Sequence, residues 1–161
     1  MKYDRSTGSW TFASMERSPV QKLTQEDFAA LLAFRTGLRR YLRWSEGAAR
    51  AAGLTPAQHQ LLLAVKGHGP DRRPTIGNLA EYLLLRHHST VELVNRAETA
   101  GLVTRERDAD DNRVIRVRLT PAADRVLAEL TAMHLAELRR LAPILDGLNA
   151  ELKSLESKPG D

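Results

Sequence analysis

The sequence contains no cysteine, which excludes disulfide bonds, thiolate metal sites and thiol-based redox sensing. Aromatic residues make up only 5% of its 161 residues. No apolar run approaches the roughly 20 residues that a membrane-spanning helix needs. The polar stretch from Met1 to Pro19 also lacks the continuous apolar core of a signal peptide. We therefore expect a cytoplasmic protein with no membrane partner.

Motifs of common enzymes are missing as well. There is no Gly-x-Ser-x-Gly, no His-Glu-x-x-His and no Gly-Lys-Ser/Thr sequence. His87 and His88 are adjacent and cannot easily share one ion, while His59, His68 and His134 are scattered along the chain. We therefore expect no enzyme, no cofactor and no metal ligand, and keep a metal-responsive regulator as an alternative.

The composition that remains is that of a soluble, helical, basic domain. The hydrophobic set makes up 42% and charged residues 27%, which is ordinary for a globular protein. The length suits one compact domain with a real core. The net charge of +4 and the sequence pI of about 9.8 suit a polyanionic partner, although many basic proteins bind no nucleic acid.

Capping residues and glycines predict six helices. Thr24 with Asp27 resembles a capping box, and Gly53 closes the first helix. Thr-Pro pairs at 55–56 and 120–121 place a cap before a proline at the first helical position. Pro143 should break or bend the long C-terminal run. The expected helices are therefore about 24–51, 56–67, 75–83, 86–100, 121–142 and a last segment after residue 143.

The segment from Leu79 to Thr120 predicts a winged helix-turn-helix. It reads as helix, short turn, helix, a glycine stop at Gly101, a strand, a charged turn and a second strand. In the second strand, apolar residues alternate with Arg116 and Arg118, the period of a half-buried strand. The fold class is therefore mainly α (α+β), with a helix built for the major groove beside a β-hairpin wing.

Helix phase predicts which residues face DNA. If Thr90, Leu93, Val94 and Ala97 face the core, the first turn of their helix is free to reach base edges. A helix start near Thr75 would meet a phosphate with backbone N–H groups. The predicted contacts from this region are Thr75, Arg86, His87, His88, Ser89 and Val91.

The wing supplies the other predicted contact. Arg113 lies in the hairpin turn, where an arginine can enter the minor groove, and Asp111 is placed to orient it by a salt bridge. Four more arginines are expected to flank the DNA backbone, and the alternative is a solvated, salt-bridged hairpin, because acidic residues are interspersed. These flanking residues are Arg105, Arg107, Arg116 and Arg118.

The chain ends are expected to form a dimer. We assign residues 1–22 to a flexible N-terminal arm, 23–53 to an N-terminal dimerisation helix, 54–120 to the DNA-binding domain and 121–161 to C-terminal dimerisation helices. Paired half-sites demand two reading heads at a fixed spacing, which favours an intermolecular bundle. The alternative is that these helices complete a monomeric core.

A small-molecule effector is also expected, on weaker grounds. Arginine is a natural partner for a carboxylate, although aromatic residues at helical spacing are more often core. The candidate ligand-binding residues are Arg35, Tyr41, Trp44 and His59, with Phe34 beside them.

Residues 24–156 resemble the MarR family of transcriptional regulators. The likeness rests on the segments 54–58, 79–81, 93–103, 105–108, 111–113 and 119–121, in the family's order and spacing. The resemblance implies a homodimer that binds a palindromic operator, usually as a repressor released by a phenolic or other aromatic anion. It places major-groove contacts on His87, His88, Ser89 and Val91, and the wing arginine on Arg113. A winged helix used only for protein contact is the alternative function.

Overall fold

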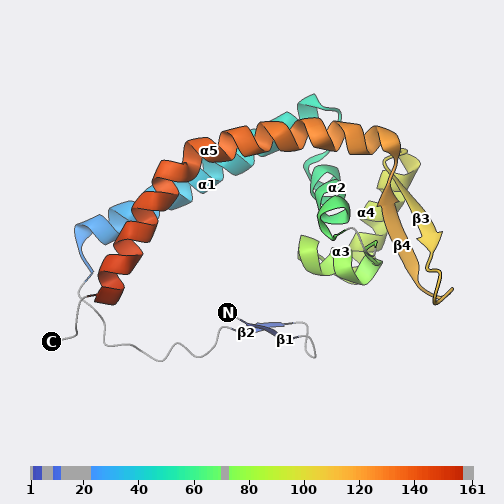
Figure 1. Ribbon diagram of the computed structural model, residues 1–161, viewed down its shortest axis with the longest axis horizontal. Coiled ribbons are helices and arrows are strands. Elements are labelled where there is room, and N and C mark those ends of the chain that lie inside the picture. The colour runs from blue at the N-terminus through green and yellow to red at the C-terminus, as the bar shows by residue number, and fades with distance from the viewer. Residues whose placement is uncertain (1, 5–8, 12–22, 70–72, 158–161) are drawn as a thin grey trace. The chain divides into compact units, whose positions relative to one another are not determined.

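The computed structural model describes residues 2–4, 9–11, 23–69 and 73–157. The elements are β1 (Lys2–Asp4), β2 (Ser9–Thr11), α1 (Gln25–Ala51), α2 (Pro56–Gly67), α3 (Ile76–Leu83), α4 (His87–Thr99), β3 (Val103–Arg107), β4 (Ile115–Leu119) and α5 (Pro121–Ser157) (Figure 1). They form two compact units, one of residues 1–37 with 142–161 and one of residues 38–141. The predicted fold class, mainly helical with a β-hairpin wing, is confirmed.

Local capping explains where the helices begin. Thr24 and Asp27 form the reciprocal hydrogen bonds of a capping box before α1. Thr55 does the same with Gln58, with Pro56 at the first helical position of α2. At the other ends, Gly53 and Gly101 have φ of +77° and +70°, a conformation that glycine adopts at little cost. These predicted boundaries are confirmed.

The core of the unit formed by residues 38–141 lies between α2, α4, the hairpin and the first half of α5. Leu61 and Leu62 of α2 are fully buried, and so is Leu79 of α3. The four residues of α4 that were predicted to face the core are all buried. Other members of this core are Leu54, Val65, Val103, Val117, Leu127 and Leu130. The apolar face of α4 is thereby fixed inward, and its other face is left free.

The wing is an antiparallel hairpin whose register pairs Val103 with Leu119 and Arg107 with Ile115. Val117 also donates its N–H to the carbonyl of Pro74 (3.0 Å), and Thr75 forms a bridge with Arg116. Backbone hydrogen bonds therefore connect the wing to the start of α3.

Three features differ from the sequence prediction. Helix α5 continues through Pro143, so a separate sixth helix is wrong; proline removes one N–H donor, and the helix-forming residues around it keep the run helical. A short pair of strands, with Tyr3 opposite Trp10, occupies part of the predicted N-terminal arm. Leu84, between α3 and α4, adopts φ of +54°, which is uncommon for a leucine.

No helix in the described part of the chain is long and apolar enough to cross a membrane.

Candidate nucleic-acid interface

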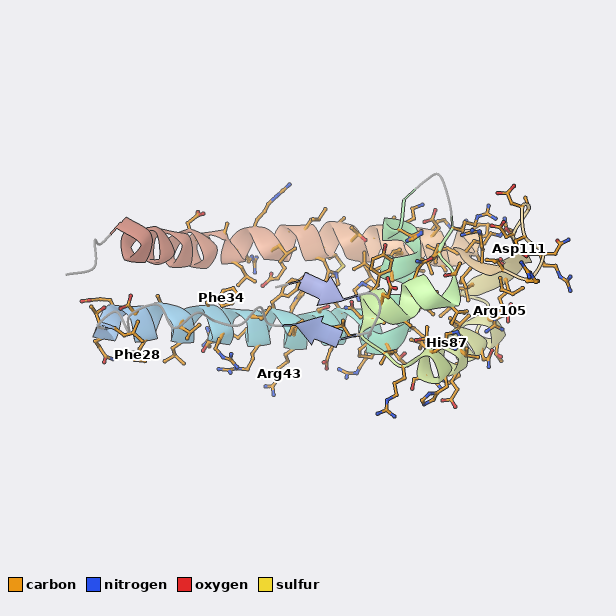
Figure 2. All side chains as sticks on the ribbon, turned by 90° about the horizontal axis from the view of Figure 1, so that it is seen from below. Phe28, Phe34, Arg43, His87, Arg105 and Asp111 are labelled. Atoms are coloured by element: carbon orange, nitrogen blue, oxygen red, sulfur yellow. The ribbon has the colours of Figure 1, made fainter. Side chains whose placement is uncertain are left out.

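The first turn of α4 presents polar side chains to solvent. Arg86 is the N-cap residue, and His87 and His88 begin the helix with exposed side chains. Ser89 and Val91 are half-buried, on the border of the same face. Figure 2 shows His87 on this helix. The residues predicted to read bases therefore form one accessible strip.

Arg86 caps α4 without a side-chain hydrogen bond to the backbone. Its carbonyl accepts instead from the N–H of Thr90 (3.0 Å) and from the Thr90 hydroxyl (3.2 Å). The guanidinium of Arg86 is exposed and takes no part in this cap. The helix start is thus fixed by the backbone, which leaves the arginine side chain available for a phosphate or a base.

Thr75 is the N-cap of α3, as expected, but its own donors are occupied. Its N–H and its hydroxyl both donate to Asn78 Oδ1 (3.0 and 2.9 Å), and its hydroxyl oxygen accepts from the Asn78 N–H. A phosphate at this helix end would therefore meet the N–H groups of the following residues, because the first N–H groups of a helix lack intrahelical partners.

Arg113 and Asp111 form a two-pronged ion pair at the wing. Arg113 Nε lies 3.0 Å from Asp111 Oδ1, and Arg113 Nη2 lies 3.0 Å from Asp111 Oδ2. The hydrogen bonds from Arg113 lower the pKa of Asp111, and they raise the pKa of Arg113. Since the Arg113 side chain is 91% exposed, the pair directs a cation outward without burying it.

Asp108 organises the wing turn from inside, a role that the sequence analysis missed. Its Oδ1 accepts from the N–H groups of Asp110 (2.9 Å) and Asp111 (3.1 Å), and its Oδ2 pairs with Arg116 Nε. The hydrogen bond from Arg116, with those from the turn, lowers the pKa of Asp108 to about 2. An aspartate followed by two or three turn residues is the signal that identifies such a turn.

Two of the four arginines expected to flank the DNA backbone are engaged within the protein. The Arg116 side chain is only 14% exposed and pairs with Asp108, so the structure contradicts a backbone contact from this residue. Arg105 Nη1 bonds Glu98 Oε2 (2.7 Å), and its Nη2 bonds Asn95 Oδ1 (2.6 Å). Arg105, labelled in Figure 2, thereby connects β3 to α4.

Arg118 and Arg107 remain on the outside of the hairpin. Arg118 is half exposed and lies 2.7 Å from Glu106 Oε1, and Arg107 is exposed. Glu106 also pairs with Arg73. Alternating signs therefore cover this side of the hairpin, which agrees with the salt-bridged alternative for part of the wing.

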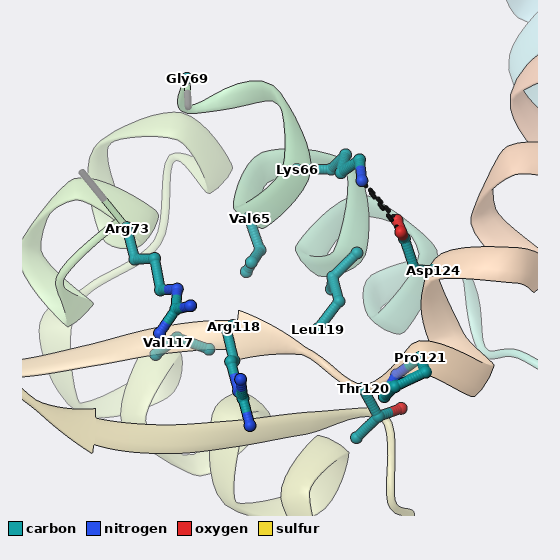
Figure 3. A pocket seen from close by; sticks show the side chains of 10 residues that line it. All are labelled: Val65, Lys66, Gly69, Arg73, Val117, Arg118, Leu119, Thr120, Pro121 and Asp124. Atoms are coloured by element: carbon teal, nitrogen blue, oxygen red, sulfur yellow. Dashed lines mark hydrogen bonds and ion pairs between the residues drawn. The ribbon is translucent and has the colours of Figure 1, made fainter. Parts of the chain in front are cut away.

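A cavity of about 590 Å³ lies beside β4 (Figure 3). Val65, Val117 and Leu119 contribute apolar surface, and Lys66 at its edge pairs with Asp124 (2.7 Å). Its lining carries three cations, Lys66, Arg73 and Arg118, against the one carboxylate of Asp124, and Glu106 outside the lining pairs with both arginines.

The structure brings three of the predicted ligand residues together around a residue that was not predicted. The ring centroid of His134 lies 4.9 Å from that of Trp44, 6.1 Å from that of Tyr41 and 4.7 Å from that of His59. His59 and His134, expected to be scattered, are therefore neighbours. Arg35, the fourth predicted ligand residue, is exposed on α1 and belongs to the other compact unit.

A second cavity, of about 350 Å³, adjoins this cluster. Ser45, Glu46 and His59 line it, together with Leu42, Pro56, Ala57 and Gln60. Among the residues that the structure describes, no three histidine, cysteine or acidic side chains are grouped to hold a metal ion.

Comparison with known proteins identifies this module. The sequence profile of the MarR family matches residues 52–113. Over that segment, which is less than half of the chain, the sequence is similar to the MarR family. An uncharacterized HTH-type transcriptional regulator of Bacillus subtilis (strain 168), YsmB, is 34% identical over 65 residues, which are 40% of this chain and 44% of that protein. The match thus spans less than half the length of that relative.

Solved structures of similar fold cover most of the chain. MepR, a transcription regulator of the Staphylococcus aureus multidrug efflux pump MepA, is 18% identical with a TM-score of 0.65, over 81% of this chain and 96% of that one. A point mutant of S. aureus MepR bound to an oligodeoxyribonucleotide is 19% identical with a TM-score of 0.59, over the same shares. At these identities the likeness establishes the fold.

Two alanines occupy buried packing positions of this module. Ala97 is fully buried on α4, and Ala123 is 1% exposed. The Ala123 N–H donates to the Thr120 hydroxyl (3.2 Å), so the start of α5 accommodates a methyl group here. Both alanines therefore lie in packing positions, away from the exposed face of α4.

Proposed function

We propose that this protein is a homodimeric, sequence-specific DNA-binding transcriptional regulator that represses from a palindromic operator. The observation that carries the proposal is the geometry of one module: α4 exposes Arg86, His87 and His88 at its first turn, and the adjoining hairpin directs Arg113 outward. A recognition helix beside a wing suits simultaneous contact with a major and a minor groove. The oligodeoxyribonucleotide-bound MepR structure supports the same use of this fold.

The proposed contacts fall into two kinds. His87, His88 and Ser89 offer hydrogen-bond donors and acceptors to base edges, and Val91 offers an apolar surface to a thymine methyl group. Arg113 is proposed to enter the minor groove, where negative potential attracts guanidinium groups. Arg86 and the start of α3 are proposed to contact phosphates of the DNA backbone. These contacts position the protein without reading the base sequence.

Dimerisation is proposed from the apolar face of α1. Phe28, Leu31 and Leu32 are 50% to 63% exposed, and Leu38 and Leu42, further along the same stripe, are 43% and 48% exposed. Figure 2 shows Phe28 on this helix. Large apolar side chains repeated at helical spacing on a free surface are typical of a protein interface. A second copy of the chain supplies an equivalent face, as a two-fold dimer requires.

Release by a small ligand is proposed at the cluster of Tyr41, Trp44 and His59. The adjoining cavity of about 350 Å³ lies between α1 and α2, so its occupant would contact both the long helix and the DNA-binding module. Rings and a neighbouring imidazole suit an aromatic anion.

The test is titration of labelled duplex DNA at several salt concentrations, with molar mass measured by light scattering. We expect a dimer whose log affinity falls linearly with log salt, because cations at the interface release counterions from DNA. A winged helix used only for protein contact is the second candidate, favoured by the mixed charge around Glu106. Binding to no duplex, even at low salt, would favour that candidate.

A further inference from the structure

We propose that His59 and His134 form a buried acid-sensing pair that couples pH to DNA binding. The proposal rests on the proposed function for its output, since DNA affinity is what the pair would regulate. The pair itself is a property of the fold and is tested separately below.

The two rings meet deep inside the unit of residues 38–141. Their centroids are 4.7 Å apart, and the residues are 3% and 8% exposed. His59 comes from the first turn of α2 and His134 from the middle of α5, 75 positions later in the chain. Two imidazoles in this contact cannot both become charged without strong repulsion, because few water molecules screen them.

Hydrogen bonds hold His134 in one neutral tautomer. Its Nδ1 lies 2.7 Å from the carbonyl oxygen of Leu130, which only accepts, so Nδ1 carries the proton. Its Nε2 lies 2.7 Å from Ser45 Oγ and accepts the hydroxyl proton in the neutral ring. A second proton on Nε2 would turn this acceptor into a donor and force the hydroxyl to rotate. The arrangement is complete with neutral histidine and is disturbed by protonation.

The surroundings of His59 also disfavour its charged form. Burial, and then the nearby His134, lower the pKa of His59. The ring belongs to the first turn of α2, where the positive end of the helix dipole opposes a cation. The titratable groups that the structure places beside the pair include Tyr41, whose ring centroid lies 6.1 Å from that of His134, and Glu46, which lines the same cavity as His59. Glu137 follows His134 by three positions on α5.

These neighbours provide little compensation for a charge. Burial raises the pKa of Tyr41, so this phenol stays neutral. Glu46 lines the same cavity as His59, but its carboxylate is half exposed and lies 3.2 Å from Arg50. Glu137 pairs with Arg140 (3.4 Å). Acidification therefore puts a weakly compensated charge between α2 and α5.

The position of the pair gives that charge a consequence for the DNA-binding module. Helix α2 carries His59 at its start and the core residues Leu61, Leu62 and Val65 immediately after it. Repulsion between His59 and His134 therefore acts on the helix against which α3 and α4 pack. We expect acid to loosen this packing and to misplace the first turn of α4 on DNA.

Trp44 provides a local reporter of the pair. The sequence has two tryptophans, so a Trp10→Phe variant leaves only Trp44, whose ring centroid lies 4.9 Å from that of His134. A protonated imidazole beside an indole quenches its fluorescence. Because burial and then His134 lower the pKa of His59 from its ordinary value of 6.5, we expect the emission of the folded Trp10→Phe protein to fall in one step at a pH below that value.

Matched variants decide whether the pair is responsible. The step should disappear when His134→Gln is added and should persist when the exposed His68 is changed to Gln instead. Far-UV circular dichroism at each pH confirms that the helices remain. An emission that does not change with pH, or a step that survives His134→Gln, would overturn the acid-sensing pair.

DNA affinity then tests the coupling. Across the pH range of the Trp44 fluorescence step we expect the parent protein to lose about tenfold in DNA affinity, the equivalent of one pKa unit, and the His59→Gln variant to lose less than about twofold. The residues proposed to contact DNA are the same in both proteins, so effects of pH at the interface itself cancel in this comparison. Equal pH dependence in parent and variant would overturn the coupling. If the Trp44 fluorescence shows the step but the protein binds DNA at no pH, the proposed function is refuted while the pair is established.

Discussion

Arg105 ties the wing to the recognition helix through Glu98. Its Nη1 lies 2.7 Å from Glu98 Oε2, and its backbone N–H lies 3.2 Å from Glu98 Oε1. The same guanidinium reaches Asn95 on the exposed face of α4. One side chain thus fixes the position of β3 relative to the helix that is proposed to read bases.

This link predicts a measurable coupling. We expect the double variant Arg105→Ala/Glu98→Ala to lose less free energy of unfolding than the two single variants lose in sum. The difference should be only roughly 0.5–1 kcal/mol, because the pair is partly exposed and screened. Urea unfolding of the four proteins of the cycle measures it. The exposed pair Arg140 and Glu137 is the matched control and should show a smaller coupling. Strict additivity for Arg105 and Glu98 would refute the link.

Substitution of Arg113 tests the contribution of the wing to DNA binding. Arg113→Ala should weaken binding to all duplexes and should reduce the slope of log affinity against log salt by about one contact. Arg140→Ala removes an equally exposed positive charge from α5 and serves as the control. If the two variants behave alike, the assignment of Arg113 to the minor groove is wrong.

We predict that substitution of His88 changes sequence specificity rather than general DNA affinity. Loss of a base contact costs about 1–3 kcal/mol on the preferred sequence, whereas binding to unrelated DNA rests on phosphates. His88→Ala should therefore lower the affinity ratio between a selected and a scrambled duplex by about tenfold. Equal losses on both duplexes would contradict base reading by this residue.

We predict that acid destabilises the wing through Asp108. The pKa of Asp108 is lowered to about 2, which means that the folded state favours the carboxylate. The carboxylate's contribution to stability is therefore complete above the ordinary pKa of 3.8 and is lost as pH falls towards 2. Asp108→Asn should remove that contribution at neutral pH and lower Tm by several degrees. The variant should also lose part of the parent's dependence on pH below 4. An unchanged Tm at pH 7 would show that the turn does not depend on this carboxylate.

The exposed stripe of α1 predicts the oligomeric state. Leu32→Glu places a charge on a side chain that is 63% exposed and is proposed to be covered in the dimer. Light scattering should therefore show a monomer at micromolar concentration. Leu63→Glu, on α2 and 43% exposed, is the control and should remain dimeric. A Leu32→Glu protein with the parent's mass would place the interface elsewhere.

Local signals in the sequence predicted most of the fold. The capping boxes at Thr24 and Thr55, and the glycine stops at Gly53 and Gly101, depend on residues a few positions apart, so the helix boundaries follow from them. The core face of α4 followed from its apolar spacing. Leu84 escaped prediction because the left-handed turn between α3 and α4 is occupied by a leucine rather than by glycine.

The interior of the site depended on contacts between distant parts of the chain. The hydrogen bond between Ser45 and His134 joins residues 89 positions apart, and neither residue carries a motif. The sequence does not distinguish Arg116 from Arg118. In the structure Arg116 is held inside the wing by Asp108, whereas Arg118 is half exposed. Alternation along a strand identifies the face of a side chain but not its ion-pair partner.

The central claim is that this protein recognises a specific DNA sequence as a dimer, and selection from a random duplex pool tests it most directly. At moderate salt we predict enrichment of a palindrome whose half-sites are about one helical turn apart, with enrichment lost in Arg113→Ala and altered in His88→Ala. Recovery of no sequence above background would contradict the account.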